Sequence, residues 1–281
     1  DHVCTFSLSI PSPTLAPDWA ESRAGGAFPE GSFRDRSAAP FPRPTQCHPM
    51  RAVVTSPRPV TLLGGADLAT EDLNVALPIA PAVVCADGGA RHALAHGLDP
   101  LAVIGDMDSL PPEAAAAFAD RLHPVAEQDT TDLDKALGRV EAPLVLALGV
   151  LGGRLDHELA ALHALALHPH RPCLLLGAES LCALCPPRLA LDAPGLVSLF
   201  PLGPVTARSG GLRWPLDGLA LDPLGRIGTS NAAAGPWSVE PSAPRLLVIL
   251  PRQALPLAAR ALLLAPRWPA PARRPRAPSP R

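Results

Sequence analysis

Short apolar runs alternate with helix-like stretches between residues 60 and 176, and this alternation limits the possible folds more than any other feature of the sequence. Runs of four or five residues rich in Val, Ile, Leu and Ala are typical of buried parallel strands. We expect such strands at Val60–Leu63, Ala82–Ala86, Leu101–Ile104, Leu144–Leu148 and Cys173–Leu176. Helical spacing separates them at Asp72–Ile79, Gly89–His96, Pro112–Ala119, Thr131–Val140 and Asp156–Leu167. The pattern predicts a doubly wound, mainly parallel, Rossmann-like α/β sheet with right-handed crossovers.

The pattern changes after about Leu191, where helical spacing stops. Short runs at Gly195–Phe200, Gly218–Leu221, Arg226–Thr229 and Leu246–Leu250 are punctuated by Gly and Pro, which predicts a small antiparallel β-sandwich domain. Eight prolines in residues 1–49 oppose helix and sheet, so we expect a disordered extension there, with Met50 as one candidate for the natural start. The predicted organisation is a disordered extension at 1–49, an α/β domain at 50–190, a β domain at 191–252 and a Pro/Arg-rich tail at 253–281.

Composition excludes several classes of protein. The formal charge of −2 gives no cationic surface for nucleic acid or for an anionic membrane. No apolar run reaches the roughly 18 to 20 residues that a membrane-spanning helix needs. The six cysteines are too few for a disulfide-stapled secreted domain, and a cytoplasmic protein is expected.

Polar clusters follow the predicted strands, where an open α/β sheet binds its ligands. In ADGGA, Asp87 precedes Gly88 and Gly89, which allow a backbone to approach a ligand and lead into a helix N-terminus that favours anions. An ordinary turn is the alternative. In GDMDS, Asp106 and Asp108 are two residues apart, so both carboxylates lie on one side if the strand direction persists. They could then share a hard cation, or they could simply cap a turn.

The segment QDTTDLDKAL, at 128–137, adds a third acidic cluster. Thr131 is placed to cap a helix, and Asp129 and Asp132 stand near its start on the expected ligand side. Lys135 is the only lysine in a chain with 23 arginines, which hints that a compact point charge is needed there. A structural ion pair with Asp132 or Asp134 is the alternative.

The segment GVLGGRLDHELA, at 149–160, combines a glycine-rich turn with Arg154 and Asp156. The planar guanidinium of Arg154 suits a bidentate contact to phosphate. No Walker loop of the form GxxxxGK[ST] is present, and GGAD at Gly64 is not a full dinucleotide-binding motif. Several carboxylates, an arginine and glycine turns at one sheet edge suit Mg²⁺-assisted phosphoryl transfer.

These four motifs, with GLRWPL at 211–216 and GTSN at 228–231, resemble the signature series of the thiamine pyrophosphokinase family. The resemblance covers about residues 60 to 250 and leaves both ends outside. It implies an enzyme that converts ATP and thiamine into AMP and thiamine diphosphate. It also implies a homodimer whose active sites lie between the α/β domain of one subunit and the β domain of the other.

The resemblance further assigns residue roles. It implies that Asp106, Asp108 and Asp132 hold Mg²⁺ and act in catalysis, together with Thr131, Arg154 and Asp156. The implied cofactor-binding residues lining the site are Asp87, Gly88, Gly89, Gln128 and Lys135, and the implied thiamine-pocket residues are Trp214, Ser230 and Asn231. An indole face attracts a desolvated cation by about 2 kcal/mol, which suits the thiazolium, although Trp214 could instead be a core residue.

Two other functions use similar acidic groups. A Mg²⁺-dependent phosphohydrolase or a sugar transferase acting on a nucleotide would not need GLRWPL and GTSN and would not release AMP. A catalytically silent nucleotide-binding module should have lost at least one acidic position, and none is missing from the series. One departure from the family pattern is Arg91, where the family often carries Asn.

Overall fold

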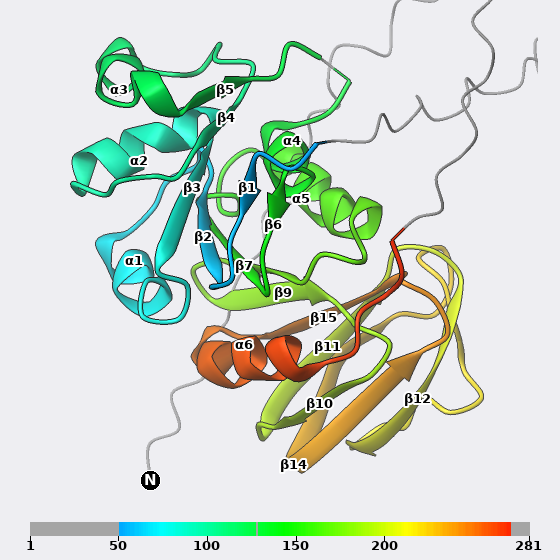
Figure 1. Cartoon of the computed structure of the whole chain (residues 1–281). Coiled ribbons are helices and arrows are strands. Elements are labelled where there is room, and N and C mark those ends of the chain that lie inside the picture. Colours follow the sequence, from blue (N-terminus) through cyan, green and yellow to red (C-terminus); the bar gives the residue numbers. More distant parts are fainter. Residues whose placement is uncertain (1–50, 128, 271–281) are drawn as a thin grey trace, which may run out of the picture. The chain divides into compact units, whose positions relative to one another are not determined.

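The computed structural model describes residues 51–127 and 129–270. The predicted disordered extension, Gln128 and the end of the predicted tail lie outside these residues. Six strands of the first half run parallel, three in a ten-stranded sheet and three in a three-stranded sheet, and the two sheets lie side by side at β2 and β3 (Figure 1). They are β2 (Val60–Leu63), β3 (Ala82–Ala86), β4 (Val103–Gly105), β5 (Leu122–Pro124), β7 (Val145–Leu148) and β8 (Cys173–Leu176). A short parallel pair, β1 (Val54–Thr55) with β6 (Val140–Glu141), forms a separate two-stranded sheet.

Helices cover both faces of these parallel strands. Successive residues of a strand point to opposite faces, so Leu63 joins one apolar cluster and Leu62 the other. The first cluster includes α1 (Thr70–Ala76), α2 (Ala90–Ala95) and α3 (Pro112–Ala117). The second includes α4 (Asp132–Leu137) and α5 (Leu155–Leu167). Short 3₁₀ turns, η1 (Asp87–Gly89) and η2 (Ala119–Arg121), extend two of the connections.

The second half continues the same sheet with antiparallel strands. β9 pairs with β8, β15 with β9, β11 with β15, and β14 with β11, β10 and β12. Their bounds are β9 (Ser180–Leu184), β10 (Leu189–Asp192), β11 (Gly195–Pro201), β12 (Val205–Leu212), β13 (Ala220–Leu221), β14 (Gly228–Pro241) and β15 (Leu246–Pro251). A mixed sheet with helices is therefore confirmed.

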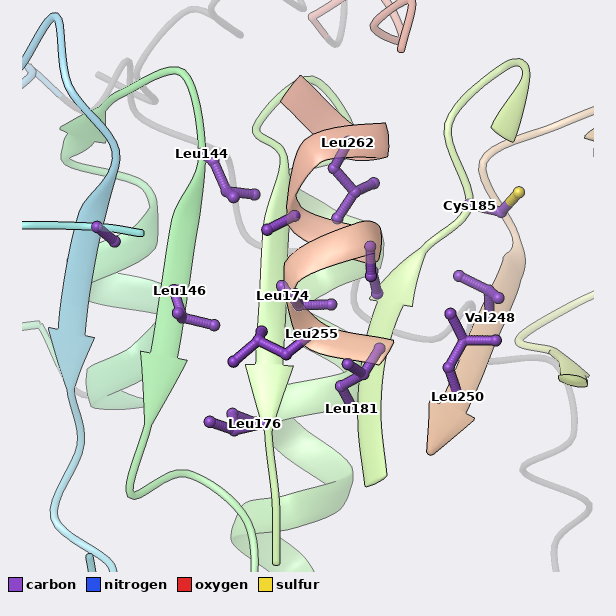
Figure 2. Close-up of a cluster of buried hydrophobic side chains, with 14 of the residues drawn as sticks. Leu144, Leu146, Leu174, Leu176, Leu181, Cys185, Val248, Leu250, Leu255 and Leu262 are labelled. Carbon is purple, nitrogen blue, oxygen red and sulfur yellow. The ribbon is translucent and has the colours of Figure 1, made fainter. Parts of the chain in front are cut away.

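Residues 253–264 differ from the prediction, because they form part of the fold instead of a tail. After η3 (Arg252–Ala254), helix α6 (Leu255–Leu264) packs over β8, β9 and β15 (Figure 2). Leu255, Ala258, Ala259 and Leu262 are buried with helical spacing, and Pro256 is tolerated in the first turn, where no N–H partner is lost. Burying each leucine contributes about 2 kcal/mol. The expected end of helical structure near Leu191 is therefore wrong.

Strand bounds also differ in places. The predicted strand Leu101–Ile104 begins two residues later, and Arg226–Thr229 contains only the start of the long strand β14. Among residues 51–127 and 129–270, no helix has the length and apolar character needed to cross a bilayer.

Candidate active site

Three carboxylates converge where β3 and β4 end. The two strands are parallel neighbours, so their carboxyl ends lie at the same sheet edge (Figure 1). Asp87 follows β3 directly, and Asp106 and Asp108 follow β4. One carboxylate oxygen from each lies within 4.8 Å of the other two, a spacing that would let all three bind one metal ion. Oxygen ligands of this kind suit Mg²⁺.

A turn, and not a continued strand, brings Asp106 and Asp108 together. β4 ends at Gly105, and Met107 has a φ of 70°, which breaks the extended direction expected from the sequence. Asp87 is also left-handed, with a φ of 39°. Such backbone conformations are unfavourable outside glycine and occur often at functional sites. Gly105 is required here, since a Cβ on it would lie 2.6 Å from Cβ of Asp87.

Asp87 is the buried member of the triad. Its side chain is fully buried, and Oδ2 accepts a hydrogen bond of 3.1 Å from the backbone N–H of Ser109. Oδ1 is buried with no hydrogen-bond partner among the described residues. Burial, reinforced by nearby carboxylates, raises the pKa of Asp87 to about 6. An unpartnered buried oxygen facing two other carboxylates fits a cation ligand.

This burial predicts a stability effect for an Asp87→Asn variant. The unfolded pKa is about 3.9, so between about pH 4 and 6 the folded chain binds the proton more tightly, and the free energy of unfolding falls as pH rises. Without divalent metal, Asp87→Asn should therefore be more stable than the parent by about 2 to 3 kcal/mol at pH 7 and by little at pH 4. Urea melts in EDTA across this pH range measure the difference.

Added Mg²⁺ provides the control for that measurement. An ion bound by the parent offsets the charge of Asp87, so the difference in free energy of unfolding between Asp87→Asn and the parent should shrink as Mg²⁺ is added. A difference between the two proteins that stays constant from pH 4 to pH 7 would contradict the burial of an ionised Asp87.

Lys135 lies beside the triad, inside α4. Its side chain is only 2% exposed, and its ammonium donates to Asp106 Oδ2 at 2.6 Å and to Asp132 Oδ1 at 3.4 Å. Burial disfavours the charged ammonium, but the hydrogen bond to Asp106 and the charges of Asp132 and Asp106 raise the pKa of Lys135 overall. The same contact lowers the pKa of Asp106. The lone lysine of the sequence is therefore a buried point charge between two of the predicted site residues.

Asp132 stands outside the triad and is linked to it through Lys135. Burial raises the pKa of Asp132. Thr131 occupies the N-cap position of α4 with extended backbone, as expected, but its side chain makes no cap hydrogen bond. Its carbonyl accepts from the N–H of Lys135 instead. Gln128 lies outside the described residues.

The remaining α/β residues lie in two glycine-rich turns. Gly88 and Gly89 are buried in η1, and a Cβ on Gly89 would lie 2.0 Å from the carbonyl oxygen of Leu63, so only glycine fits. Arg154 and Asp156 are exposed at the start of α5, joined by hydrogen bonds of 3.1 and 2.6 Å. This bidentate pair orients the guanidinium, whose predicted phosphate contact stays a prediction.

The predicted thiamine residues gather in the antiparallel half. Trp214 is 52% exposed, so it is not a core residue, and the guanidinium of Arg213 lies 4.8 Å from its ring centroid. Asn231 is buried and bonds both backbone groups of Trp214, accepting at 3.1 Å and donating at 2.7 Å. Ser230 has a φ of 61°, and its N–H donates to Ser198 Oγ at 2.9 Å. These contacts hold an exposed indole in a defined place.

Sequence reasoning missed several residues that shape the site. Gly105 and Ser109 fix Asp87, and Met107 makes the turn between the two aspartates. The motif GDMDS contained the signal for Gly105, because a glycine beside two carboxylates indicates a close approach. Asp87 was expected in the polar lining of the site and not among the metal ligands, whereas the structure groups it with Asp106 and Asp108.

Comparisons with known proteins agree on one family. A family model described as thiamin pyrophosphokinase, catalytic domain, matches residues 75–175, which include the triad and Lys135. Thiamine pyrophosphokinase 3 of Oryza sativa subsp. japonica is 30% identical over 239 residues, covering 68% of this chain and 89% of that protein. Thiamine pyrophosphokinase 1 of Arabidopsis thaliana is 30% identical over 189 residues, covering 53% of this chain and 69% of that protein.

Solved structures share the fold. Thiamin pyrophosphokinase from Candida albicans superposes with a TM-score of 0.58 at 16% identity, covering 70% of this chain and 95% of that one. Thiamin pyrophosphokinase from Geobacillus thermodenitrificans gives a TM-score of 0.57 at 24% identity, covering 68% and 96%. At these identities the likeness establishes the fold.

Proposed function

Because the chain belongs to the thiamine pyrophosphokinase family, we propose that it transfers a pyrophosphoryl group from ATP to the hydroxyethyl group of thiamine, giving thiamine diphosphate and AMP. The comparisons confirm the predicted family and the prediction that the chain is an enzyme. The observation that carries the specific reaction is the carboxylate triad beside the buried ammonium of Lys135. Such a site combines metal ligands with a fixed positive charge, as transfer from a polyphosphate requires.

We assign the metal site to Asp87, Asp106 and Asp108. Two observations support this choice over a set that contains Asp132. Oδ1 of Asp87 is buried without a hydrogen-bond partner among the described residues, and one carboxylate oxygen from each of the three residues lies within 4.8 Å of the other two. A bound Mg²⁺ would neutralise charge on the triphosphate and orient it. The ammonium of Lys135 holds Asp106 in place.

Asp132 is the proposed proton acceptor. It lies one helical turn from Lys135, and its raised pKa makes it a better base than an exposed aspartate. The thiamine hydroxyl gives its proton to a carboxylate oxygen of Asp132, and the hydroxyl oxygen of thiamine bonds to the β-phosphorus of ATP. The bond from that phosphorus to the α-phosphate oxygen breaks, and AMP leaves with the electron pair. Arg154 is proposed to contact a phosphate through its exposed fork.

Thiamine is proposed to bind at Trp214 of a second copy of the chain. Asn231 lies on β14, and Trp214 follows the end of β12. These strands lie near one end of the ten-stranded sheet, and β2 lies at its other end. β3 and β4 belong to the three-stranded sheet that contacts β2. One chain therefore does not bring the proposed thiamine and phosphate groups together, which supports a homodimer with shared sites. In this scheme the Rossmann-like parallel half binds ATP and the antiparallel, sandwich-like half binds thiamine. The buried free cysteines support a cytoplasmic location.

An AMP assay tests the reaction. The chain is incubated with ATP and Mg²⁺, with and without thiamine, and AMP is measured by a coupled enzyme reaction. We expect AMP to form only when thiamine is present. Release of ADP or phosphate at a rate independent of thiamine would indicate a phosphohydrolase and would overturn the proposal.

Substituting Trp214 by Ala should weaken thiamine binding selectively. An indole face attracts a desolvated cation by about 2 kcal/mol, so removing the indole that thiamine would cover should raise KM for thiamine by roughly tenfold or more, with KM for MgATP within twofold. The KM for thiamine of Trp214→Phe should fall between those of the parent and of Trp214→Ala. Equal changes in both KM values would assign Trp214 a packing role. Mixing Trp214→Ala chains with Asp106→Asn chains should restore activity if the sites are shared between subunits.

A further inference from the structure

Helix α4, which carries Asp132 and Lys135, is too short to hold its own orientation. It has six residues, and an isolated helix of that length is unstable in water. Its apolar residues Leu133, Ala136 and Leu137 pack in the cluster that also contains α5. Apolar packing is not directional, so it fixes the rotation of a short helix less tightly than polar contacts do.

A buried hydrogen bond between two side chains holds α4 on a second side. His168, at the C-terminus of α5, donates from Nε2 to Oδ1 of Asp134 at 2.5 Å. Both residues are only 6% exposed. Leaving a buried carboxylate without a partner is unfavourable, so Asp134 remains paired with His168 in the folded chain. Successive helical residues point about 100° apart, so Asp134 leaves α4 in a different direction from Lys135.

The segment that follows His168 also binds the end of α4. The guanidinium of Arg171 donates to the carbonyl oxygen of Gly138 at 3.0 Å and to that of Val140. Gly138 is the C-cap of α4. The residues between α5 and β8 therefore contact α4 at Asp134 and just beyond its last turn.

Contacts on two sides of a helix set its rotation. Lys135 bonds Asp106 on one side, and Asp134 bonds His168 on another. A rotation of about 20° moves an atom about 6 Å from the helix axis by roughly 2 Å. Such a shift would break the 2.6 Å contact between Lys135 and Asp106. The geometry beside the carboxylate triad therefore depends on the pair behind the helix.

We propose that His168 is a positioning residue of the phosphate-transfer site. Through Asp134 it fixes the rotation of α4, and so it sets Lys135 and Asp132 against Asp106. The proposal rests on the proposed function for the identity of that site. His168 itself contacts neither the triad nor Lys135 through any bond found among the described residues, and it acts on the site through α4.

A matched pair of substitutions tests this role. In His168→Gln the terminal amide can place a donor near the position of Nε2, whereas the shorter amide of His168→Asn cannot reach Asp134. We expect His168→Asn to raise KM for MgATP and to lower kcat/KM for MgATP by tenfold or more, with KM for thiamine within twofold of the parent. His168→Gln should recover most of the activity. Steady-state kinetics with each substrate varied in turn give these values.

An ion pair elsewhere in the fold provides the control for stability. Arg252 and Asp72 are 2.5 Å apart, partly buried, and make no contact with α4. Arg252→Gln should lower the melting temperature without changing KM for MgATP, because it removes an ion pair that does not bond α4. A folded His168→Asn protein with kcat and both KM values within twofold of the parent would overturn the proposal, and so would the same kinetic pattern in Arg252→Gln.

Calorimetric binding of MgATP separates this proposal from the proposed function. A parent chain that binds MgATP but does not modify thiamine would refute the function, and weakened MgATP binding by His168→Asn would still support the positioning role. If the parent makes thiamine diphosphate but His168→Asn binds MgATP as tightly as the parent, the positioning role is refuted and the proposed function stands.

Discussion

Replacing Asp106 by Asn should lower the rate of thiamine diphosphate formation by about a hundredfold or more, because the variant loses one charged ligand of the proposed metal site. Asn has nearly the same shape, and its amide oxygen can still accept the hydrogen bond of Lys135. The fold should therefore survive, and circular dichroism melts would show it. Steady-state rates at increasing Mg²⁺ measure the loss, which excess metal should reverse only in part.

Asp120→Asn is the charge-matched control for Asp106→Asn. Asp120 is exposed in η2, away from the triad, and its loss changes the net charge equally. The rate of thiamine diphosphate formation by Asp120→Asn should stay within twofold of the parent rate. A folded Asp106→Asn enzyme with near-parental turnover would remove Asp106 from the metal site.

Replacing Lys135 by Met should cause a comparable loss of activity and a loss of stability. Met fills a similar volume, but Asp106 and Asp132 would face each other without the ammonium that lies between them. Removing one partner of a buried ion pair costs about 3 to 5 kcal/mol. We expect kcat/KM to fall by about a hundredfold or more and the free energy of unfolding to fall by about 3 kcal/mol in EDTA.

Mg²⁺ and a Lys135→Arg variant sharpen this test. Mg²⁺ should restore part of the stability of Lys135→Met, because a bound cation compensates the same carboxylates. Lys135→Arg keeps the charge, but its planar fork does not reproduce the compact ammonium, so activity should remain low while stability recovers. Activity of Lys135→Met within threefold of the parent would show that the ammonium is not needed.

The sequence predicted five of the six parallel strands because those five are mostly apolar runs, whereas β5 (Leu-His-Pro) has no such run and was not predicted. Val60–Leu63, Ala82–Ala86 and Cys173–Leu176 have the predicted bounds. Helix α6 was missed because the prolines after Leu250 suggested a tail, although Pro256 stands where a first turn accepts it. β12 was missed because Gly210 and Gly211 interrupt its apolar pattern.

The candidate site was predicted in part. The convergence of Asp106 and Asp108 followed from their spacing, although a left-handed Met107 and not a strand brings them together. The place of Asp87 in the triad depends on β3 and β4 being neighbours, and strand order cannot be read from periodicity. The pairing of Asp134 with His168 joins residues 34 apart in sequence, and no local pattern indicates it.

Isotope transfer from ATP tests the central claim most directly. ATP labelled with ³²P at either the α- or the β-phosphorus is incubated with the chain, Mg²⁺ and thiamine, and the products are separated by chromatography. Attack at the β-phosphorus predicts that β-label appears in thiamine diphosphate in equal yield with AMP, while α-label stays in AMP. Thiamine monophosphate with β-label retained in ADP, or label in free phosphate whether or not thiamine is present, would contradict the account.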